Sequence, residues 1–209
     1  MLFQEVEKME LVIITTDTLF DHEAEAINTL CKEGVQVLHL RKPQSTKEQM
    51  ELLLKQINPF YLNRMVLHDH FDLVQQFGLK GYHLNSRNKE VTRDRGKSIS
   101  ASCHSFQELQ DKSFCNYLFL SPIFNSLSKP GYQQAYSEIE LLQAKKNQWI
   151  NEKVYALGGI TPSNLPLLKA YGFGGAVILG FLWENFKTDK NLIRLVGRLK
   201  ELQTAIESL

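Results

Sequence analysis

Residues 154–180, VYALGGITPSNLPLLKAYGFGGAVILG, decide the fold of this chain. A short apolar run at 154–157 is followed by two glycines and then by apolar residues at helical spacing over 161–171. Pro162 lies in the first turn of this predicted helix, where proline is favoured because its missing N–H would have no partner there. A second apolar run, 175–179, completes a strand–helix–strand unit, which is typical of a parallel sheet.

The same alternation runs through the rest of the chain. Short apolar runs predict six further strands, and helical spacing predicts six further helices. In one of these helices Ser105 is the expected N-cap and Glu108 stands three residues later, which predicts a capping box. The predicted strands are 11–15, 35–40, 65–68, 81–84, 98–102 and 117–120, and the predicted helices are 23–31, 47–57, 71–77, 105–111, 137–148 and 191–206.

Eight strands that alternate with helices indicate an α/β fold built on a parallel sheet. The number favours a closed (β/α)8 TIM barrel. An open, doubly wound sheet is the alternative, because the fourth strand is weak and the helix after it is poorly defined. The 209 residues contain no linker and no low-complexity stretch, so we expect one barrel domain over residues 1–209.

The composition excludes some classes of partner. With 24 basic and 23 acidic residues the net charge is +1, which leaves no global electrostatic footprint for nucleic acid. Three cysteines without a C-x-x-C pair indicate neither a disulfide framework nor a zinc ribbon, so a reducing cytoplasm is the simplest compartment. The first ten residues carry three glutamates and no long apolar run, so we expect no signal peptide, no membrane span and no membrane partner.

In (β/α)8 barrels the active site lies at the carboxyl ends of the strands. Five of the six histidines fall there, together with Arg41 and Lys42, and they predict a polar rim with positive charge that suits an anionic substrate. The alternative for each histidine is a hydrogen-bonded structural role. These histidines are His39, His68, His70, His83 and His104.

The glycines at the ends of the last two strands predict a phosphate site. Gly158 and Gly159 have no Cβ, so a phosphate can approach their backbone closely. Gly180 ends the next strand, and a short helix predicted over 181–186 would point its N–H groups at the same phosphate. A tight turn without a ligand is the alternative interpretation.

The loop after the sixth strand carries a second candidate for phosphate binding. Ser126, Ser128 and Lys129 form an S-x-S-K sequence, and hydroxyls and a lysine bind phosphate oxygens. A solvated surface loop is the alternative. The three residues would lie over the glycine site if the barrel prediction holds.

A metal site is also a candidate. Asp69 is a suitable oxygen ligand for Mg²⁺, whereas His68 and His70 beside it would suit a softer metal. A structural carboxylate is the alternative. Cys103 is expected to be buried by the alternation of its strand, and the order of residues alone identifies no catalytic triad.

Several motifs follow one another along nearly the whole chain. They are HLRK (39–42), HDHFDL (68–73), GYHL (81–84), SCHS (102–105), LSPIFNSLSK (120–129), LGGITP (157–162) and GAVILG (175–180). In this order they resemble the thiamine phosphate synthase family and the related thiazole tautomerase branch. The PIF and GGITP segments are the most specific parts.

The resemblance implies a transferase that joins hydroxymethylpyrimidine diphosphate to a thiazole phosphate. Diphosphate leaves with the help of Mg²⁺, the implied cofactor, and the thiazole nitrogen then captures the pyrimidine cation. This is physically consistent, because a metal and cations stabilise a leaving group as its charge develops. The implied partners are small phosphorylated substrates, and a homodimer is a possible assembly.

On the diphosphate side, the resemblance assigns roles to single positions. Arg41 matches the arginine that binds diphosphate, with a part in catalysis, and Ser102 matches another diphosphate contact. Asp69 matches a metal-binding aspartate, and Asn88 stands at the second metal position. His39 stands at a substrate-binding position where the family usually has glutamine.

On the thiazole side, Ser126 and Ser128 replace two threonines that hold the thiazole phosphate. Lys129 matches the lysine beside them, to which the resemblance gives a catalytic role. The implied backbone contacts to this phosphate come from Gly159, Leu179 and Gly180.

The departures from the family pattern lie mostly on the diphosphate side. The family lysine that follows the diphosphate arginine falls on Pro43, with Lys42 as a candidate substitute, and the asparagine before the metal aspartate is His68. The second metal carboxylate is replaced by Asn88 or Arg87. This loss weakens Mg²⁺ binding, because ligand charge largely sets the affinity for hard cations.

These departures leave two alternatives to the transferase. One is a thiazole tautomerase-like isomerase, which needs only the thiazole phosphate. The catalytic histidine of that branch falls on Pro122, so His104 or His68 would have to move the proton. The other is a non-catalytic binder of a thiazole phosphate.

Overall fold

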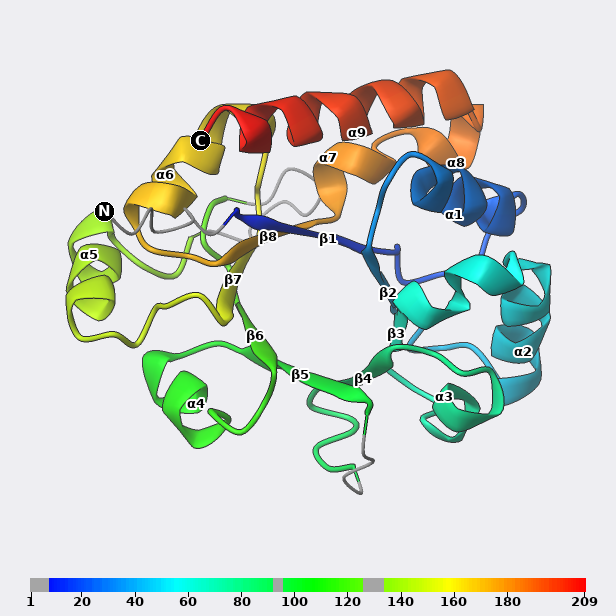
Figure 1. Cartoon of the computed structure of the whole chain (residues 1–209), viewed down its shortest axis with the longest axis horizontal. Coiled ribbons are helices and arrows are strands. Elements are labelled where there is room, and N and C mark those ends of the chain that lie inside the picture. The colour runs from blue at the N-terminus through cyan, green and yellow to red at the C-terminus, as the bar shows by residue number, and fades with distance from the viewer. Residues whose placement is uncertain (1–7, 92–95, 126–133) are drawn as a thin grey trace, which may run out of the picture.

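The computed structural model describes residues 8–91, 96–125 and 134–209 and confirms a closed (β/α)8 TIM barrel. Every strand pairs in parallel with its neighbours in sequence, and β8 pairs with β1 to close the ring, which Figure 1 shows with the helices outside it. The strands are β1 (Glu10–Ile14), β2 (Val37–Leu40), β3 (Met65–Leu67), β4 (Gly81–Leu84), β5 (Ser98–Cys103), β6 (Tyr117–Leu120), β7 (Val154–Leu157) and β8 (Gly175–Ile178).

The helices follow the predicted order with two differences near β8. The helix predicted at 161–171 divides into a 3₁₀ turn, η2, and α6, and the one predicted at 181–186 is replaced by two short helices, α7 and α8. A 3₁₀ turn before β3, η1, was not predicted. The bounds are α1 (Glu23–Lys32), α2 (Lys47–Gln56), η1 (Pro59–Arg64), α3 (Asp72–Gln76), α4 (Phe106–Asp111), α5 (Glu138–Lys146), η2 (Pro162–Asn164), α6 (Leu165–Ala170), α7 (Gly180–Trp183), α8 (Phe186–Asp189) and α9 (Leu192–Glu207).

The predicted capping box of α4 is only half formed. The Ser105 side chain accepts from the backbone N–H of Glu108 at 3.2 Å, as expected of an N-cap. The Glu108 carboxylate instead accepts from the backbone N–H of His104 at 3.3 Å and from Lys112 at 3.0 Å. The Glu108 carboxylate is therefore shared by two other donors, and the box is not completed.

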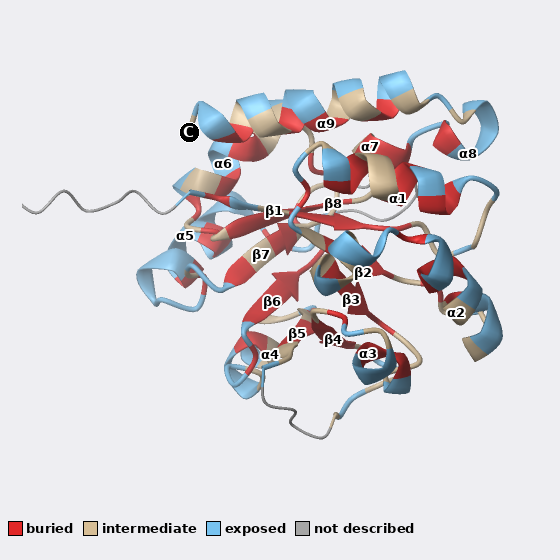
Figure 2. Cartoon of the chain, turned by 45° about the vertical axis from the view of Figure 1, so that its right-hand side comes forward, coloured by how far each residue is buried: buried red, intermediate tan, exposed pale blue. Residues whose placement is uncertain are grey.

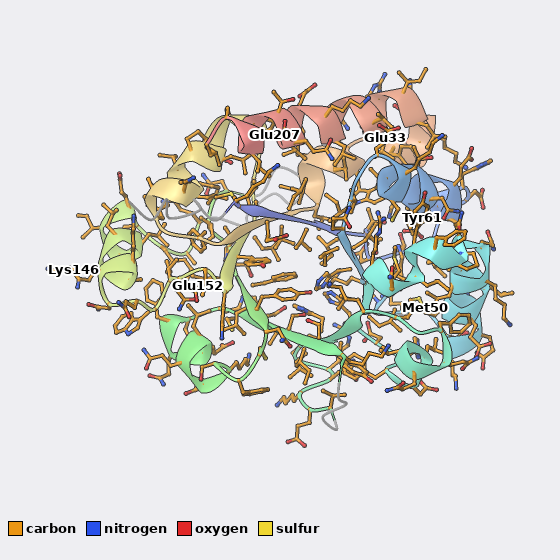
Figure 3. The ribbon with its side chains drawn as sticks, viewed as in Figure 1. Glu33, Met50, Tyr61, Lys146, Glu152 and Glu207 are labelled. Atoms are coloured by element: carbon orange, nitrogen blue, oxygen red, sulfur yellow. The ribbon has the colours of Figure 1, made fainter. Side chains whose placement is uncertain are left out.

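The core has two parts. A large apolar layer lies between the outside of the strands and the helices, and Figure 2 shows the inner faces of α1, α2 and α9 buried against it. A smaller cluster lies inside the ring, where side chains fill the middle in Figure 3. Its buried members all come from β1, β6 and β8, and they are Val12, Ile14, Tyr117, Phe119 and Val177.

The other half of the barrel interior is polar. His39, His68 and His83 are buried there, with 0%, 3% and 0% of their surface exposed. This contradicts the predicted rim of five histidines for these three, because their side chains point into the barrel rather than to its mouth. His70 and His104 are less buried and follow β3 and β5.

Hydrogen bonds connect the three buried imidazoles to their surroundings. His39 Nδ1 bonds with His68 Nε2 at 3.0 Å, and His39 Nε2 bonds with the Tyr117 hydroxyl at 2.7 Å. His83 bonds with the hydroxyls of Ser100 and Ser102, at 2.9 and 2.8 Å, and stacks on His68 with ring centroids 4.0 Å apart. Buried polar groups are costly without hydrogen-bond partners, and these contacts supply them.

Burial sets the charge of these imidazoles. Desolvation, followed by the charges of neighbouring groups, holds the pKa values of His39 and His68 well below the ordinary value, and it lowers the pKa of His83 to about 3. All three are therefore neutral at pH 7.

Two further sequence predictions can be compared with the fold. The three cysteines are free and buried, so Cys103 is buried as expected. Within the described ranges, no helix has the length and apolar character needed to cross a membrane.

We predict that acid destabilises the fold through the buried histidines. A histidine whose folded pKa is depressed binds a proton only after unfolding, so its stabilisation is present above about pH 6.5 and is lost as the pH falls. Each histidine would remove up to about 1.4 kcal/mol per pH unit from the free energy of unfolding. Urea unfolding between pH 7.5 and 5.0 measures this slope.

The substitution His39→Gln is expected to lower that slope, because it removes one of the titrating groups. His22→Gln is the control, since His22 is exposed and lies outside the barrel. A free energy of unfolding that stays constant over this pH range would contradict the prediction.

Candidate functional site

An open cleft of about 670 Å³ lies where β1, β2 and β8 end. Three predicted site residues, Arg41, Leu179 and Gly180, line it, so the structure brings these three together. Its volume is in the range of small-molecule sites. The other lining residues are Thr16, Asp17, Thr161, Phe181, Trp183, Glu184, Asn185 and Lys187.

The glycine turn after β7 has a conformation and a closeness of approach that require glycine. Gly158 and Gly159 have φ values of +110° and +65°. A Cβ on Gly159 would lie 2.2 Å from the carbonyl oxygen of Asn125. Asn164 stabilises the turn, because its Nδ2 donates a hydrogen bond to the Gly159 carbonyl at 2.9 Å.

The short helix α7 begins at Gly180, beside the cleft. The first N–H groups of a helix have no acceptor within it. Trp183 fixes α7 on the barrel, because its Nε1 donates to the carbonyl of Ile14 at 2.8 Å. The backbone near Gly180 is therefore held in place next to Arg41.

Lys42 does not replace the family lysine that is missing at Pro43. Its side chain is buried, and its Nζ donates to the carbonyls of Thr16 and Thr18 at 2.8 and 2.9 Å and to Glu23 Oε1 at 2.5 Å. The ion pair connects β2 to the start of α1. Lys42 therefore positions the loop after β1 and is not available to a ligand.

Asp69 and Asn88, the predicted metal ligands, lie together after β3 and β4. Arg87 donates to both carboxylate oxygens of Asp69, from Nε to Oδ1 and from Nη2 to Oδ2, each at 3.0 Å. Asn88 Nδ2 donates to Asp69 Oδ1 at 3.0 Å and to the His68 carbonyl at 2.9 Å. The carboxylate is thus occupied by donors that belong to the chain.

The remaining described candidates lie deeper or on other loops. Both ring nitrogens of His39 are engaged inside the barrel, and the Ser102 hydroxyl bonds with His83. His104 is exposed, and its Nδ1 lies 3.2 Å from the carbonyl oxygen of Ser121. The roles predicted for these residues, and for His68, stay predictions.

Three predicted thiazole-side residues, Ser126, Ser128 and Lys129, lie outside the described residues. The residues on either side of this segment are placed. Phe124 N donates to the Gly158 carbonyl at 3.1 Å, and Gln134 N donates to Asn125 Oδ1 at 2.9 Å. Both ends of the segment therefore lie beside the glycine turn.

Sequence reasoning missed two cations near the site. Lys187 lines the cleft from α8, and its Nζ contacts the Thr18 hydroxyl at 2.5 Å. The second cation is Arg87, which the sequence analysis names only as a residue that stands where the family has its second metal-binding carboxylate. Its pairing with Asp69 joins two strand ends across 18 residues, and no local pattern reveals a pair at that separation.

Comparisons with known proteins agree with this geometry. The family described as thiamine monophosphate synthase matches residues 11–181. A crystal structure of thiamine phosphate pyrophosphorylase from Bacteroides thetaiotaomicron is 40% identical, covers 95% of this chain and 98% of its own, and superposes with a TM-score of 0.85.

Curated relatives give the same indication at lower identity. A thiamine-phosphate synthase of Flavobacterium johnsoniae is 24% identical and covers 84% of this chain and 89% of its own length. A thiamine-phosphate synthase of Caldivirga maquilingensis is 29% identical and covers 77% of this chain and 82% of its own length. The family match spans most of the barrel and includes the glycine turn, Arg41 and Gly180, so the chain belongs to the thiamine monophosphate synthase family.

Proposed function

We propose that this chain is a thiamine phosphate synthase, a transferase that joins hydroxymethylpyrimidine diphosphate and thiazole phosphate to give thiamine phosphate and diphosphate. The observation that carries the proposal is the cleft that brings Arg41, Leu179 and Gly180 together in a member of this family. The substrates would be the small phosphorylated molecules that its cations and backbone N–H groups suit.

The reaction needs little covalent help from the protein. The bond between the pyrimidine methylene carbon and the diphosphate oxygen breaks with both electrons on oxygen. The lone pair of the thiazole nitrogen then forms the new carbon–nitrogen bond. Fixed positive charge beside the departing oxygen lowers the barrier, because it is already oriented when the negative charge develops. Arg41 would supply part of this charge.

The two ends of the site would have different tasks. The glycine turn, with Ser126, Ser128 and Lys129 next to it in sequence, would hold the thiazole phosphate. The polar end near Asp69 and Ser102 would receive the diphosphate. Holding both substrates at the same end of the barrel would replace a bimolecular encounter by an oriented one, which lowers the entropic part of the barrier.

The family resemblance implies Mg²⁺ at Asp69 and Asn88, but the described donors do not fit it. Mg²⁺ prefers several oxygen ligands in an octahedral shell. Asp69 accepts from Arg87 and Asn88, and Asn88 turns its NH₂ group toward the carboxylate. Among the described residues, the one group of three possible metal ligands is His39, His68 and His83, which contains no carboxylate. No step is therefore assigned to the metal.

The proposal is tested by incubating the full chain with both substrates and detecting thiamine phosphate by mass. Arg41→Ala is expected to lower turnover on the order of 10²-fold, because it removes preorganised charge at the leaving group. Arg194→Ala is the matched control, since Arg194 pairs with Asp189 at the start of α9, away from the lining of the cleft.

Absence of thiamine phosphate above the level of a reaction without protein would refute the transferase. Proton exchange into a thiazole phosphate carboxylate would then identify the isomerase. Tight binding of thiazole phosphate without turnover would identify a binder.

The phosphate half of the site can be tested separately with two glycines. Gly159→Ala is expected to weaken binding of thiazole phosphate by tenfold or more, about 1.4 kcal/mol, because the new methyl group would collide with Asn125. Gly78→Ala is the matched control. Gly78 has nearly the same φ, +64°, but nothing lies within 4 Å of its Cβ position. Calorimetry measures the affinities, and equal affinities in the two variants would contradict the proposed cradle.

A further inference from the structure

Arg87 lies in the loop after β4 and pairs with the second residue after β3. Its guanidinium and the Asp69 carboxylate meet in a two-point fork, with both nitrogen–oxygen distances at 3.0 Å. Such charge-assisted pairs are strong and directional. The side chain of Asp69 is 12% exposed and that of Arg87 39%, so the carboxylate lies beneath the guanidinium.

The loop also holds Arg87 through its backbone. The Arg87 N–H donates to Asn85 Oδ1 at 3.0 Å, and Asn85 Nδ2 donates to the His68 carbonyl at 2.8 Å. Asn88 donates to the same carbonyl. The guanidinium is therefore ordered before any ligand arrives, and this reduces the entropy lost on binding.

Part of the guanidinium remains available. Nε and Nη2 are used by Asp69, whereas Nη1 forms no hydrogen bond with the described part of the chain. Arg41 follows β2 and Arg87 follows β4, so both lie at the end of the barrel where the parallel strands terminate. Ser102, the other implied diphosphate contact, bonds with His83, which stacks on that imidazole.

We propose that Arg87 takes the place of the divalent metal at this end of the barrel, so that the chain binds diphosphate without Mg²⁺. The identity of the ligand rests on the proposed function. When the carbon–oxygen bond breaks, its electron pair stays on the diphosphate, where Arg41 supplies positive charge and Arg87, paired with Asp69, donates a hydrogen bond. No oxidant, reductant or proton donor is needed.

The physical chemistry of arginine fits this task. A guanidinium is always charged and weakly hydrated, and Nη1 of Arg87 can donate to a phosphate oxygen while Nε and Nη2 hold Asp69. It also opposes Mg²⁺ at the same place, because two cations a few ångströms apart repel each other. The same residue thus donates to the diphosphate and keeps the metal away from Asp69.

The test is a calorimetric titration of inorganic diphosphate into the full chain, once in EDTA and once in Mg²⁺. We expect binding in EDTA that is at most a few-fold weaker than in Mg²⁺. Arg87→Ala is expected to weaken binding in EDTA by tenfold or more, and Arg87→Lys by less, because lysine keeps the charge but loses the fork. Arg194→Ala, from another surface arginine–aspartate pair, is expected to bind like the unmodified chain.

A titration of Mg²⁺ alone gives a second measurement. The unmodified chain is expected to show no Mg²⁺ binding that depends on Asp69, and Arg87→Ala is expected to bind Mg²⁺ more tightly because Asp69 is released. Thermal unfolding confirms that each variant is folded.

The inference would be overturned if diphosphate binding required Mg²⁺, or if Arg87→Ala and Arg194→Ala bound diphosphate equally well in EDTA. It would also be overturned if the unmodified chain bound Mg²⁺ and Asp69→Asn abolished that binding. These results leave the proposed function intact if thiamine phosphate is still formed. A failure of the two-substrate assay with metal-free diphosphate binding retained would refute the function alone.

Discussion

The fold and the site both depend on how His68 is held. Its imidazole is buried inside the barrel, stacked on His83 and bonded to His39. Its backbone carbonyl accepts hydrogen bonds from the side chains of Asn85 and Asn88, and these bonds fix the loop after β4. The next residue, Asp69, holds Arg87. One residue therefore connects the neutral interior to the charged end of the site.

The barrel interior is divided into an apolar half and a polar half. Apolar side chains from β1, β6 and β8 fill one half, and imidazoles and serine hydroxyls from β2–β5 fill the other. Above the apolar half lie the glycine turn and α7, which would hold the phosphate in the proposed site. Above the polar half lies the arginine–aspartate pair. A substrate with phosphate at one end and a partner with diphosphate at the other would match this division.

Much of the fold was predictable, because strand and helix periods are local signals. The strands at 81–84, 117–120 and 154–157 were placed at their observed bounds. The direction of the histidine side chains at the strand ends was not predicted, and this explains why three histidines expected at the rim are buried. Lys42 was misjudged for a similar reason. Its partner Glu23 lies on α1, 19 residues away. The local sequence around either residue does not reveal that the two form a buried ion pair.

The ends of the segment 126–133 are tied together beside the glycine turn, through Gln134 and Asn125. A loop whose ends are fixed by the scaffold can change length at little cost, since closure entropy grows only with the logarithm of length. A change in the number of residues between Asn125 and Gln134 would therefore cost the barrel little. Substrate preference could be altered there while the ring of strands, the glycine turn and the arginine–aspartate pair are left untouched.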